Sequence, residues 1–357
     1  MYLAVRRAAA AASVGLALVL LAACTSGSEA PSRTVRLVTH DSFNVSKSVL
    51  KEFTDRTGYR VEVVSAGDAG ATVNQAVLSK GAPQGDVLFG VDTTLLSRAF
   101  DAGIFTPYQA KGLAKVPERY RADPRHRVTP VDSGDICVNY DRQYFAEHDL
   151  KPPRSLDDLT KPAYKDLLVT ENASTSSPGL AFLLATVDEY GEGADGWKQY
   201  WKKLRANGVE VVDGWEQAYN DRFSGSRGGR GEGDRPLVVS YASSPPAEVV
   251  DADPRPREAP TGVARETCFQ QVEFAGLLDG AEHAEGGAKL LDFLVSKRFQ
   301  EDMPLQMFVR PVRADAKVPE LFTRYGETAK DPATMAPQRI ADHRERWIKS
   351  WNALVVR

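Results

Sequence analysis

Residues 34–64 read TVRLVTHDSFNVSKSVLKEFTDRTGYRVEVV, in which two apolar runs flank one amphipathic segment. The runs 34–39 and 60–64 have the pattern of short strands. Between them, the apolar residues of 46–57 recur at the spacing of one helical face, and Gly58 supplies a stop signal. The segment therefore predicts a strand, a helix and a second strand.

The same alternation continues toward the C-terminus, with a helix predicted over residues 72–79 and a more buried strand over residues 86–91. Alternating strands and helices indicate an α/β fold in which crossover helices connect a parallel sheet. Ligands bind such sheets at the carboxyl ends of the strands. Asp41 and Asp92 follow the first and third strands, so both are candidate site residues.

A second α/β set begins near residue 156, and the chain then returns to the first set. We predict two lobes: residues 34–133 and 273–357 form lobe 1, and residues 134–272 form lobe 2. The further predicted elements are an extended segment at 128–140, strands at 167–170, 209–212 and 268–275, and helices from 178, at 197–205, at 288–294 and at 343–354.

The N-terminus has the pattern of a signal peptide with a lipobox. Two arginines precede an apolar run over residues 8–21, and small residues lead directly into Cys24. A membrane anchor is the alternative, but a spanning helix needs about 20 apolar residues, and this run is shorter. We predict a signal peptide over residues 1–23, a lipid on Cys24, and a tether over residues 24–33 that holds the protein outside the membrane.

The composition points to a small partner. The 45 basic and 48 acidic residues are interspersed and give a formal charge of −3, so that neither a nucleic-acid surface nor a polybasic lipid-binding segment is predicted. With Cys24 assigned to the lipid, Cys137 and Cys268 remain. In an oxidising compartment they are either a disulfide or two buried thiols.

Catalytic motifs are missing from the sequence. It has no phosphate-binding loop motif, no His-Glu-x-x-His and no Gly-x-Ser-x-Gly, and its five histidines are too scattered to form a metal set. The Gly- and Arg-rich residues 225–234 precede a strand, which favours a surface loop over a phosphate cradle. We therefore expect a binding protein, with no enzyme activity, no metal and no cofactor.

Three polar segments at predicted helix starts form a second group of candidates. Hydroxyl groups and free backbone N–H groups at a helix N-terminus favour an anion, although most such residues are only helix caps. The strongest start contains Pro178, at the first turn of an apolar helix. The candidates are Ser176 and Ser177 at this start, Ala242, Ser243, Ser244 and Pro245 at the second, and Asp92 and Thr93 at the third.

Aromatic side chains lie next to these segments in the sequence. They could stack on a flat ring and attract a cationic one, while Asp41, Asp92 and Asp135 neutralise its charge. The alternative is that the pair at i and i+4 packs along a helix and that each aspartate caps a loop. The aromatic candidates are Trp215, Tyr219, Tyr241 and Phe308.

These blocks, in this order and at this spacing, resemble the thiamine-binding lipoproteins and periplasmic proteins of bacterial ABC importers. The resemblance is carried by residues 39–43, 86–92, 174–180, 214–219, 240–245 and 271–273, and it covers nearly the whole mature chain.

The resemblance implies a two-lobed, type II periplasmic-binding-protein fold that closes by a hinge on thiamine or a thiamine phosphate. Asp92 and Thr93 would touch the thiamine, and Ser176 and Ser177 its hydroxyl or phosphate tail. Trp215 and residues 241–245 would form the wall. The implied partners are an ABC permease with its ATPase subunit, and the protein would act as a monomer outside the cytoplasmic membrane.

Three positions depart from the family pattern: His40 stands where a tyrosine is common, Asp135 replaces an aromatic residue, and Phe308 stands where a tryptophan is expected. The preference among thiamine and its phosphates is therefore open. The alternatives are the same fold binding ferric iron or a polyamine, an extracytoplasmic enzyme acting on phosphate esters, and a structural lipoprotein with a blocked cleft. Iron-binding relatives usually present adjacent tyrosines, and this chain has no Tyr-Tyr pair.

Overall fold

The computed structural model describes residues 33–226, 232–329 and 331–356. The predicted signal peptide, most of the tether with Cys24, and half of the loop 225–234 lie outside the described residues. The strands are β1 (Arg33–Thr39), β2 (Tyr59–Ser65), β3 (Val87–Asp92), β4 (Phe105–Thr106), β5 (Thr129–Asp141), β6 (Leu168–Glu171), β7 (Glu210–Val212), β8 (Leu237–Tyr241), β9 (Thr261–Leu278) and β10 (Arg310–Pro311).

Ten helices accompany the strands in the described part of the chain, together with several short helical turns. Two of these turns contribute to the site, a π-helical turn η5 (Gln217–Arg222) and a 3₁₀ turn η6 (Pro245–Val249). The helices are α1 (Lys47–Thr57), α2 (Ala69–Leu78), α3 (Leu96–Ala102), α4 (Arg142–Glu147), α5 (Ser177–Tyr190), α6 (Trp197–Ala206), α7 (Ala284–Leu294), α8 (Lys297–Gln306), α9 (Glu320–Tyr325) and α10 (Pro337–Val355).

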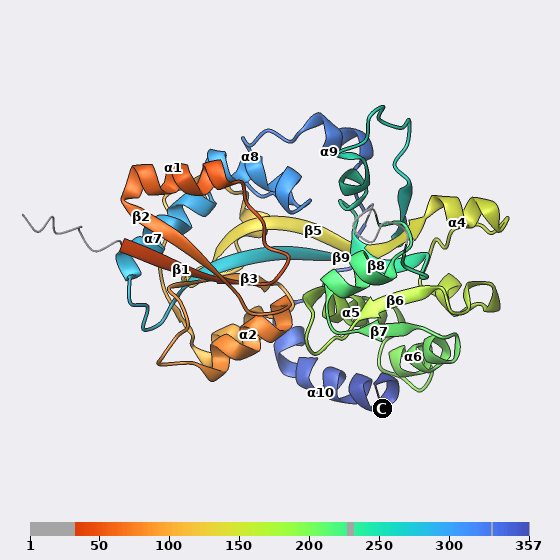
Figure 1. Cartoon of the computed structure of the whole chain (residues 1–357). Helices are drawn as coiled ribbons and strands as arrows, with labels where there is room; N and C mark the ends of the chain where they lie inside the picture. Colours follow the sequence, from red (N-terminus) through yellow and green to blue (C-terminus); the bar gives the residue numbers. More distant parts are fainter. Residues whose placement is uncertain (1–32, 227–231, 330, 357) are drawn as a thin grey trace, which may run out of the picture. The chain divides into compact units, whose positions relative to one another are not determined.

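The strands form one sheet in the order β2-β1-β3-β9-β5-β8-β6-β7. Strands β2, β1 and β3 are parallel, and so are β8, β6 and β7. Between these two parallel sets, β9 and β5 run antiparallel to each other and to their outer neighbours (Figure 1). The predicted α/β class is confirmed. The sequence did not predict that two long antiparallel strands join the parallel sets into one sheet.

Both predicted lobe boundaries fall inside these joining strands, since β5 contains the step from Ser133 to Gly134 and β9 the step from Val272 to Glu273. The lobe assignment itself stays a prediction.

The buried patterns of the elements follow from their sequences. All six residues of β3 are buried, as expected for a strand covered on both faces. Helix α5 is buried from Ser177 to Val187 and is apolar all round, which is typical of a helix inside the core. Helix α10 packs against α3 and α6, and Trp351 meets Trp201 edge to face at 5.4 Å between ring centroids. The C-terminal helix therefore touches elements of both parallel sets.

Several helices and strands begin at other residues than the sequence predicted. Helix α2 begins at Ala69 instead of residue 72, because the Asp68 carboxylate accepts the Ala69 N–H and caps the helix. Helix α5 begins at Ser177 instead of residue 178, and Ser176 is its N-cap residue. Strand β9 begins at Thr261 instead of residue 268, and α7 and α10 begin four and six residues early, at Ala284 and Pro337. Among the residues described, no helix combines the length and apolar character that a membrane span requires.

Candidate functional site

The candidate site is a cavity of about 460 Å³ where several chain segments converge on the sheet. The segment between β1 and α1 forms one side, and η5 and the end of β8 form the other; Glu273 of β9 and the residues after α8 complete it. Of the predicted site residues, the cavity brings together Asp41, Trp215, Tyr219, Tyr241 and Phe308. Its lining further includes His40, Ser42, Glu216, Glu248, Glu273 and Met307.

Three aromatic rings form a fixed wall. Trp215 stacks on Tyr219 with ring centroids 4.9 Å apart and planes 16° apart, and Tyr241 meets Trp215 nearly edge-on at 6.4 Å. Trp215 Nε1 donates to Ser240 Oγ at 2.9 Å, which fixes the indole ring. Trp215 and Tyr219 therefore have both of the roles considered from the sequence: their rings pack against each other, and both residues line the cavity.

Tyr241 is seated against the backbone of β5. A Cβ atom on Gly134 would lie 2.6 Å from Tyr241 Cδ1, so the ring needs glycine at this position. Phe308, on the other side of the cavity, has a positive φ of 55° and stacks parallel to Phe322 at 6.3 Å. A bulky residue is uncommon in this region of backbone space and is retained only where its surroundings hold it.

The polar part of the cavity is acidic. Asp41, Glu216, Glu248 and Glu273 line it, and none of its described lining residues is a lysine or arginine. Glu248 accepts the Tyr219 hydroxyl at 2.8 Å. A cavity with this charge favours a cation over an anion.

His40 and Glu273 form a buried pair at the base of the cavity. His40 Nε2 lies 3.2 Å from Glu273 Oε1, and His40 Nδ1 lies 2.9 Å from Ser42 Oγ. Burial lowers the pKa of His40 and raises the pKa of Glu273 to about 8, so that both groups are mainly neutral near pH 7. Burial, together with the interaction with the neighbouring Glu273 carboxyl group, also raises the pKa of Asp132.

Asp92, a predicted site residue, is fully buried below the cavity instead of lining it. One carboxylate oxygen accepts from the Thr94 hydroxyl at 2.7 Å and from the N–H groups of Thr94 and Leu95 at 3.1 Å. The other accepts from Gln271 Nε2, which also donates to Ser177 Oγ at 3.1 Å. Through Gln271, Asp92 therefore ties the end of β3 to the middle of β9 and to the start of α5.

The remaining predicted residues lie outside the cavity lining, and their contact with a ligand stays a prediction. Ser244 Oγ lies 2.9 Å from Ser240 Oγ, so it helps to hold the hydroxyl group that accepts the hydrogen bond from Trp215. The carbonyl of Asp135 accepts the N–H of Ala242 at 2.8 Å, and burial raises the pKa of the Asp135 carboxyl. Thr93 is partly exposed, and the buried residues of this group are Ser176, Ser177, Ala242, Ser243, Ser244 and Pro245.

Sequence reasoning missed the cavity-lining Glu216, Glu248 and Glu273, and it also missed Asp68, which supports the site from outside the lining. Its Oδ2 accepts the N–H of Trp215 at 2.8 Å, while its Oδ1 caps α2. Three residues after Asp68, the Ala71 N–H donates to the Thr175 carbonyl at 2.9 Å. The Trp215–Asp68 and Ala71–Thr175 bonds both join residues of the predicted lobe 1 to residues of the predicted lobe 2, and the bond to Asp68 positions Trp215. The available signal was an Asp following Gly67 after a strand, which is a helix-cap pattern.

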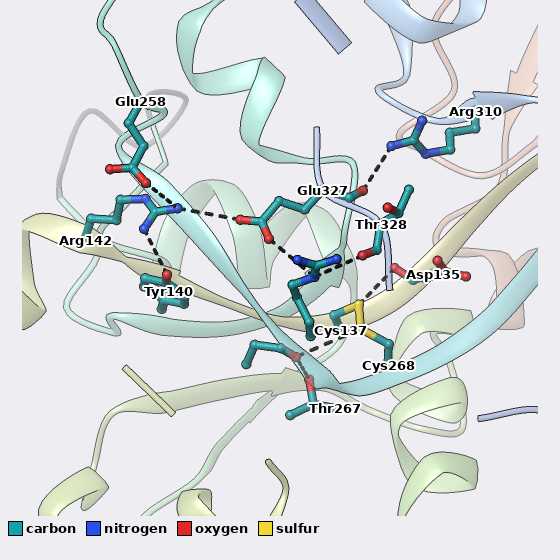
Figure 2. A network of polar contacts seen from close by, with 12 residues as sticks. Asp135, Cys137, Tyr140, Arg142, Glu258, Thr267, Cys268, Arg310, Glu327 and Thr328 are labelled. Carbon is teal, nitrogen blue, oxygen red and sulfur yellow. Dashed lines mark hydrogen bonds and ion pairs between the residues drawn. A yellow bond between two sulfur atoms is a disulfide. The ribbon is translucent and has the colours of Figure 1, made fainter. Parts of the chain in front are cut away.

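A disulfide joins the two central strands close to the site. Cys137 of β5 bonds to Cys268 of β9 with an S–S distance of 2.06 Å (Figure 2). At this place the register slips, since Ile136 pairs with Phe269 but Val138 pairs with Ala264. The Val138 N–H donates to Thr267 Oγ1 at 2.8 Å, so the bulge on β9 is held by a covalent bond and a hydrogen bond.

Charged side chains hold the segment after α9 over this bulge, as Figure 2 shows. Glu327 lies 3.6 Å from Arg142 and 3.9 Å from Arg265, and its carbonyl accepts from Arg310 Nη2 at 3.0 Å. The Arg310 guanidinium is thus occupied by a backbone carbonyl of the protein itself.

A metal centre is not formed by the described residues, in which no group of three or more His, Cys, Asp or Glu side chains is placed to hold an ion. Ferric-binding proteins nevertheless share the fold: one from Campylobacter jejuni superposes with a TM-score of 0.69 at 16% identity, covering 90% of this chain and 99% of its own. At this identity, the likeness concerns the fold alone.

Known proteins similar to this chain are solute-binding proteins. Residues 82–245 match the family model described as bacterial extracellular solute-binding protein. The thiamine-binding periplasmic protein of Salmonella typhimurium (strain LT2) is 30% identical over 327 residues, which cover 89% of this chain and 92% of the relative. The namesake protein of Escherichia coli (strain K12) is 29% identical with the same coverage.

A solved structure agrees with these relatives. It is a periplasmic thiamin binding protein that superposes with a TM-score of 0.76 at 26% identity, covering 91% of this chain and 96% of its own. The similarity extends over nearly the full length of both chains, in sequence as well as in fold. This chain therefore belongs to the bacterial extracellular solute-binding proteins, in the group that includes the thiamine-binding periplasmic proteins.

Proposed function

We propose that this protein captures thiamine outside the cytoplasmic membrane and delivers it to the permease of an ABC importer. The carrying observation is the cavity in which the Trp215–Tyr219 stack and Tyr241 face four carboxylic acid side chains. Thiamine has two flat aromatic rings joined by a methylene bridge, and its thiazolium ring carries a permanent positive charge. Aromatic faces attract such a ring, and acidic groups neutralise it. The names of the similar proteins support the same solute.

Closure of two lobes on the ligand is the proposed mechanism, and no bond is made or broken. Trp215 and Tyr241 belong to the predicted lobe 2, whereas Asp41 and Phe308 belong to lobe 1. A ligand that contacts both groups stabilises the closed form and shifts the population toward it. The Asp68–Trp215 bond is a contact that such closure would make and break. The permease would then recognise the closed form of a monomer.

The attachment to the membrane is proposed from the sequence. Cys24 follows the lipobox pattern and would carry the lipid after cleavage of residues 1–23. Mass spectrometry of the N-terminal peptide of the protein isolated from its cells checks this: a diacylglyceryl group on Cys24 supports the anchor, and an unmodified peptide that begins elsewhere contradicts it.

The acidic lining predicts that thiamine binds more tightly than its phosphate esters. A phosphate group carries a charge of about −1.5 to −2 near pH 7. The acidic lining of the cavity repels this charge, and Glu273 adds to the repulsion as the pH rises toward its pKa of about 8. We expect the monophosphate and diphosphate to bind at least about tenfold more weakly, a difference of about 1.4 kcal/mol. Calorimetry with the three compounds side by side measures this order.

The possible results of this titration separate two claims. Equal or tighter binding of a phosphate ester contradicts the charge argument but keeps the thiamine assignment. If the folded protein, freed of endogenous ligand, binds none of the three compounds, the thiamine assignment itself is wrong.

Thiamine affinity is expected to rise between pH 6.5 and 8.5, because the pKa of Glu273 in the free protein is raised to about 8. Below this pH the carboxyl group is protonated and neutral; above it, the carboxylate attracts the cation. Binding therefore releases a proton, and the affinity increases by at most about tenfold per pH unit. The titratable groups around Glu273 are His40, Asp68, Asp92, Asp132 and Tyr241.

Calorimetry in two buffers of different ionisation enthalpy counts the released protons. Glu273→Gln keeps the shape of the side chain and removes the titration, so its thiamine affinity should be nearly constant over this range. A slope that is unchanged in Glu273→Gln would assign the proton to another group.

A further inference from the structure

A second cavity, of about 440 Å³, lies away from the solute site and shares no lining residue with it. It is formed by α2, α3, the turn before α5, and α10, which Figure 1 shows in dark blue. Its lining includes Arg98, Ser174, Arg344, Glu345, Lys349 and Asn352. Three of these side chains are cationic and one is acidic, so the lining is basic where the solute cavity is acidic.

Arg344 is the central residue of this cavity. Its side chain is only 8% exposed, and within the described residues its guanidinium makes one polar contact, with Glu345 Oε1 at 3.5 Å. The side chain of Glu345 is itself 75% exposed. Burial and the nearby Arg98 lower the pKa of Arg344, whereas Glu345 and, more weakly, Asp92 and Asp101 raise it. A buried guanidinium normally has several charge-assisted hydrogen bonds, and this one has a single long contact.

Arg98 of α3, whose side chain is 34% exposed, is also weakly paired. Its Nη1 lies 3.7 Å from the same Glu345 carboxylate, and its buried Nε has no hydrogen-bond partner among the residues described. Two guanidinium groups therefore share one exposed carboxylate. Lys349 adds a third positive charge from the same helix as Arg344.

We propose that this cavity binds a small oxyanion, a molecule that carries a carboxylate or phosphate group. Guanidinium groups match the planar, two-oxygen edge of such anions. Neutral donors stand beside them, since Ser174 and Asn352 are hydrogen-bonded to each other at 2.8 Å on the cavity wall. The volume admits a small organic acid or phosphate ester as well as inorganic phosphate.

The position of the cavity gives the anion a structural effect. Arg98 lies on α3, Arg344 lies on α10, and Ser174 lies in the turn between β6 and α5. An anion bound to all three would hold elements of both parallel sets together. This inference is independent of which solute occupies the first cavity.

Titration of the full protein with inorganic phosphate and with citrate, at constant ionic strength set with chloride, tests the proposal. We expect saturable stabilisation in thermal unfolding and a binding isotherm by calorimetry. Arg98→Gln and Lys349→Gln should each weaken the binding at least tenfold. Arg344→Gln should abolish it, but Arg98→Gln and Lys349→Gln decide the question if Arg344→Gln does not fold.

Two control variants locate the bound anion. Arg346→Gln changes a neighbouring arginine on α10 that pairs with Glu192 at 2.7 Å and does not line the cavity, so the affinity should stay within twofold of the unmodified protein. Trp215→Ala alters the solute cavity and should likewise leave anion binding unchanged. The proposal is overturned by the absence of saturable binding, by equal affinity in Arg98→Gln and Arg346→Gln, or by loss of binding in Trp215→Ala alone.

Discussion

Replacing Trp215 by alanine should lower the affinity for thiamine at least about 30-fold, because the substitution removes the ring that faces the solute cavity. A desolvated cation–π contact contributes about 2 kcal/mol or more, which corresponds to this factor. The fold should persist, since the Trp215 N–H keeps its bond to Asp68 and the ring is only partly buried. Calorimetry with thiamine measures the loss, and thermal unfolding verifies the fold.

Trp215→Phe is the matched variant for this experiment. It keeps an aromatic face against Tyr219 but loses the hydrogen bond from Nε1 to Ser240. Its affinity should therefore fall by less than about tenfold, the value of one ordinary hydrogen bond. An alanine variant that is folded and binds thiamine normally would remove Trp215 from the site.

Removal of the disulfide should lower the free energy of unfolding by about 4 kcal/mol. Cys137 and Cys268 are 131 residues apart, and a cross-link over so long a loop greatly restricts the unfolded chain. Both residues are almost fully buried, so the double variant Cys137→Ala/Cys268→Ala leaves no polar group in their place. Denaturant unfolding of the double variant and the unmodified protein measures the difference.

A reducing agent supplies the control for this comparison. It should destabilise the unmodified protein toward the level of the double variant, and it should leave the double variant unchanged. Equal stability of both proteins in the absence of the reducing agent would show that the bond contributes nothing to folding.

Periodicity in the sequence was sufficient to predict the first three strands and the helices between them, because each carries a repeating apolar face. It also predicted the extended segment that became β5. The start of β9 was missed since Arg265 and Glu266 interrupt the apolar pattern, and the strand is defined there by its pairing with β5. Helix α8 was missed as well, because Pro304 and four charged residues obscure its buried face.

The candidate site likewise contains residues that the sequence predicted and residues that it did not. The sequence indicated the aromatic wall, because Trp215 and Tyr219 have helical spacing and Tyr241 ends a strand. It did not indicate Asp68, whose bond to Trp215 spans 147 residues, nor the pairing of His40 with Glu273. Such contacts depend on how distant segments meet, and local patterns carry no information about them.

The central position of β9 has a consequence for the order in which the chain folds. Strand β3 ends at Asp92 and pairs on one side with β1, but its neighbour on the other side is residues 273–277 of β9, which come much later in the chain. A nascent chain that ends before Thr261 therefore leaves both β3 and β5 with an unpaired edge. Pairing over such separations slows folding, because a long loop has to close before the contact forms. The N-terminal part of the chain therefore cannot complete its sheet before the C-terminal part is available, and the two halves become native together.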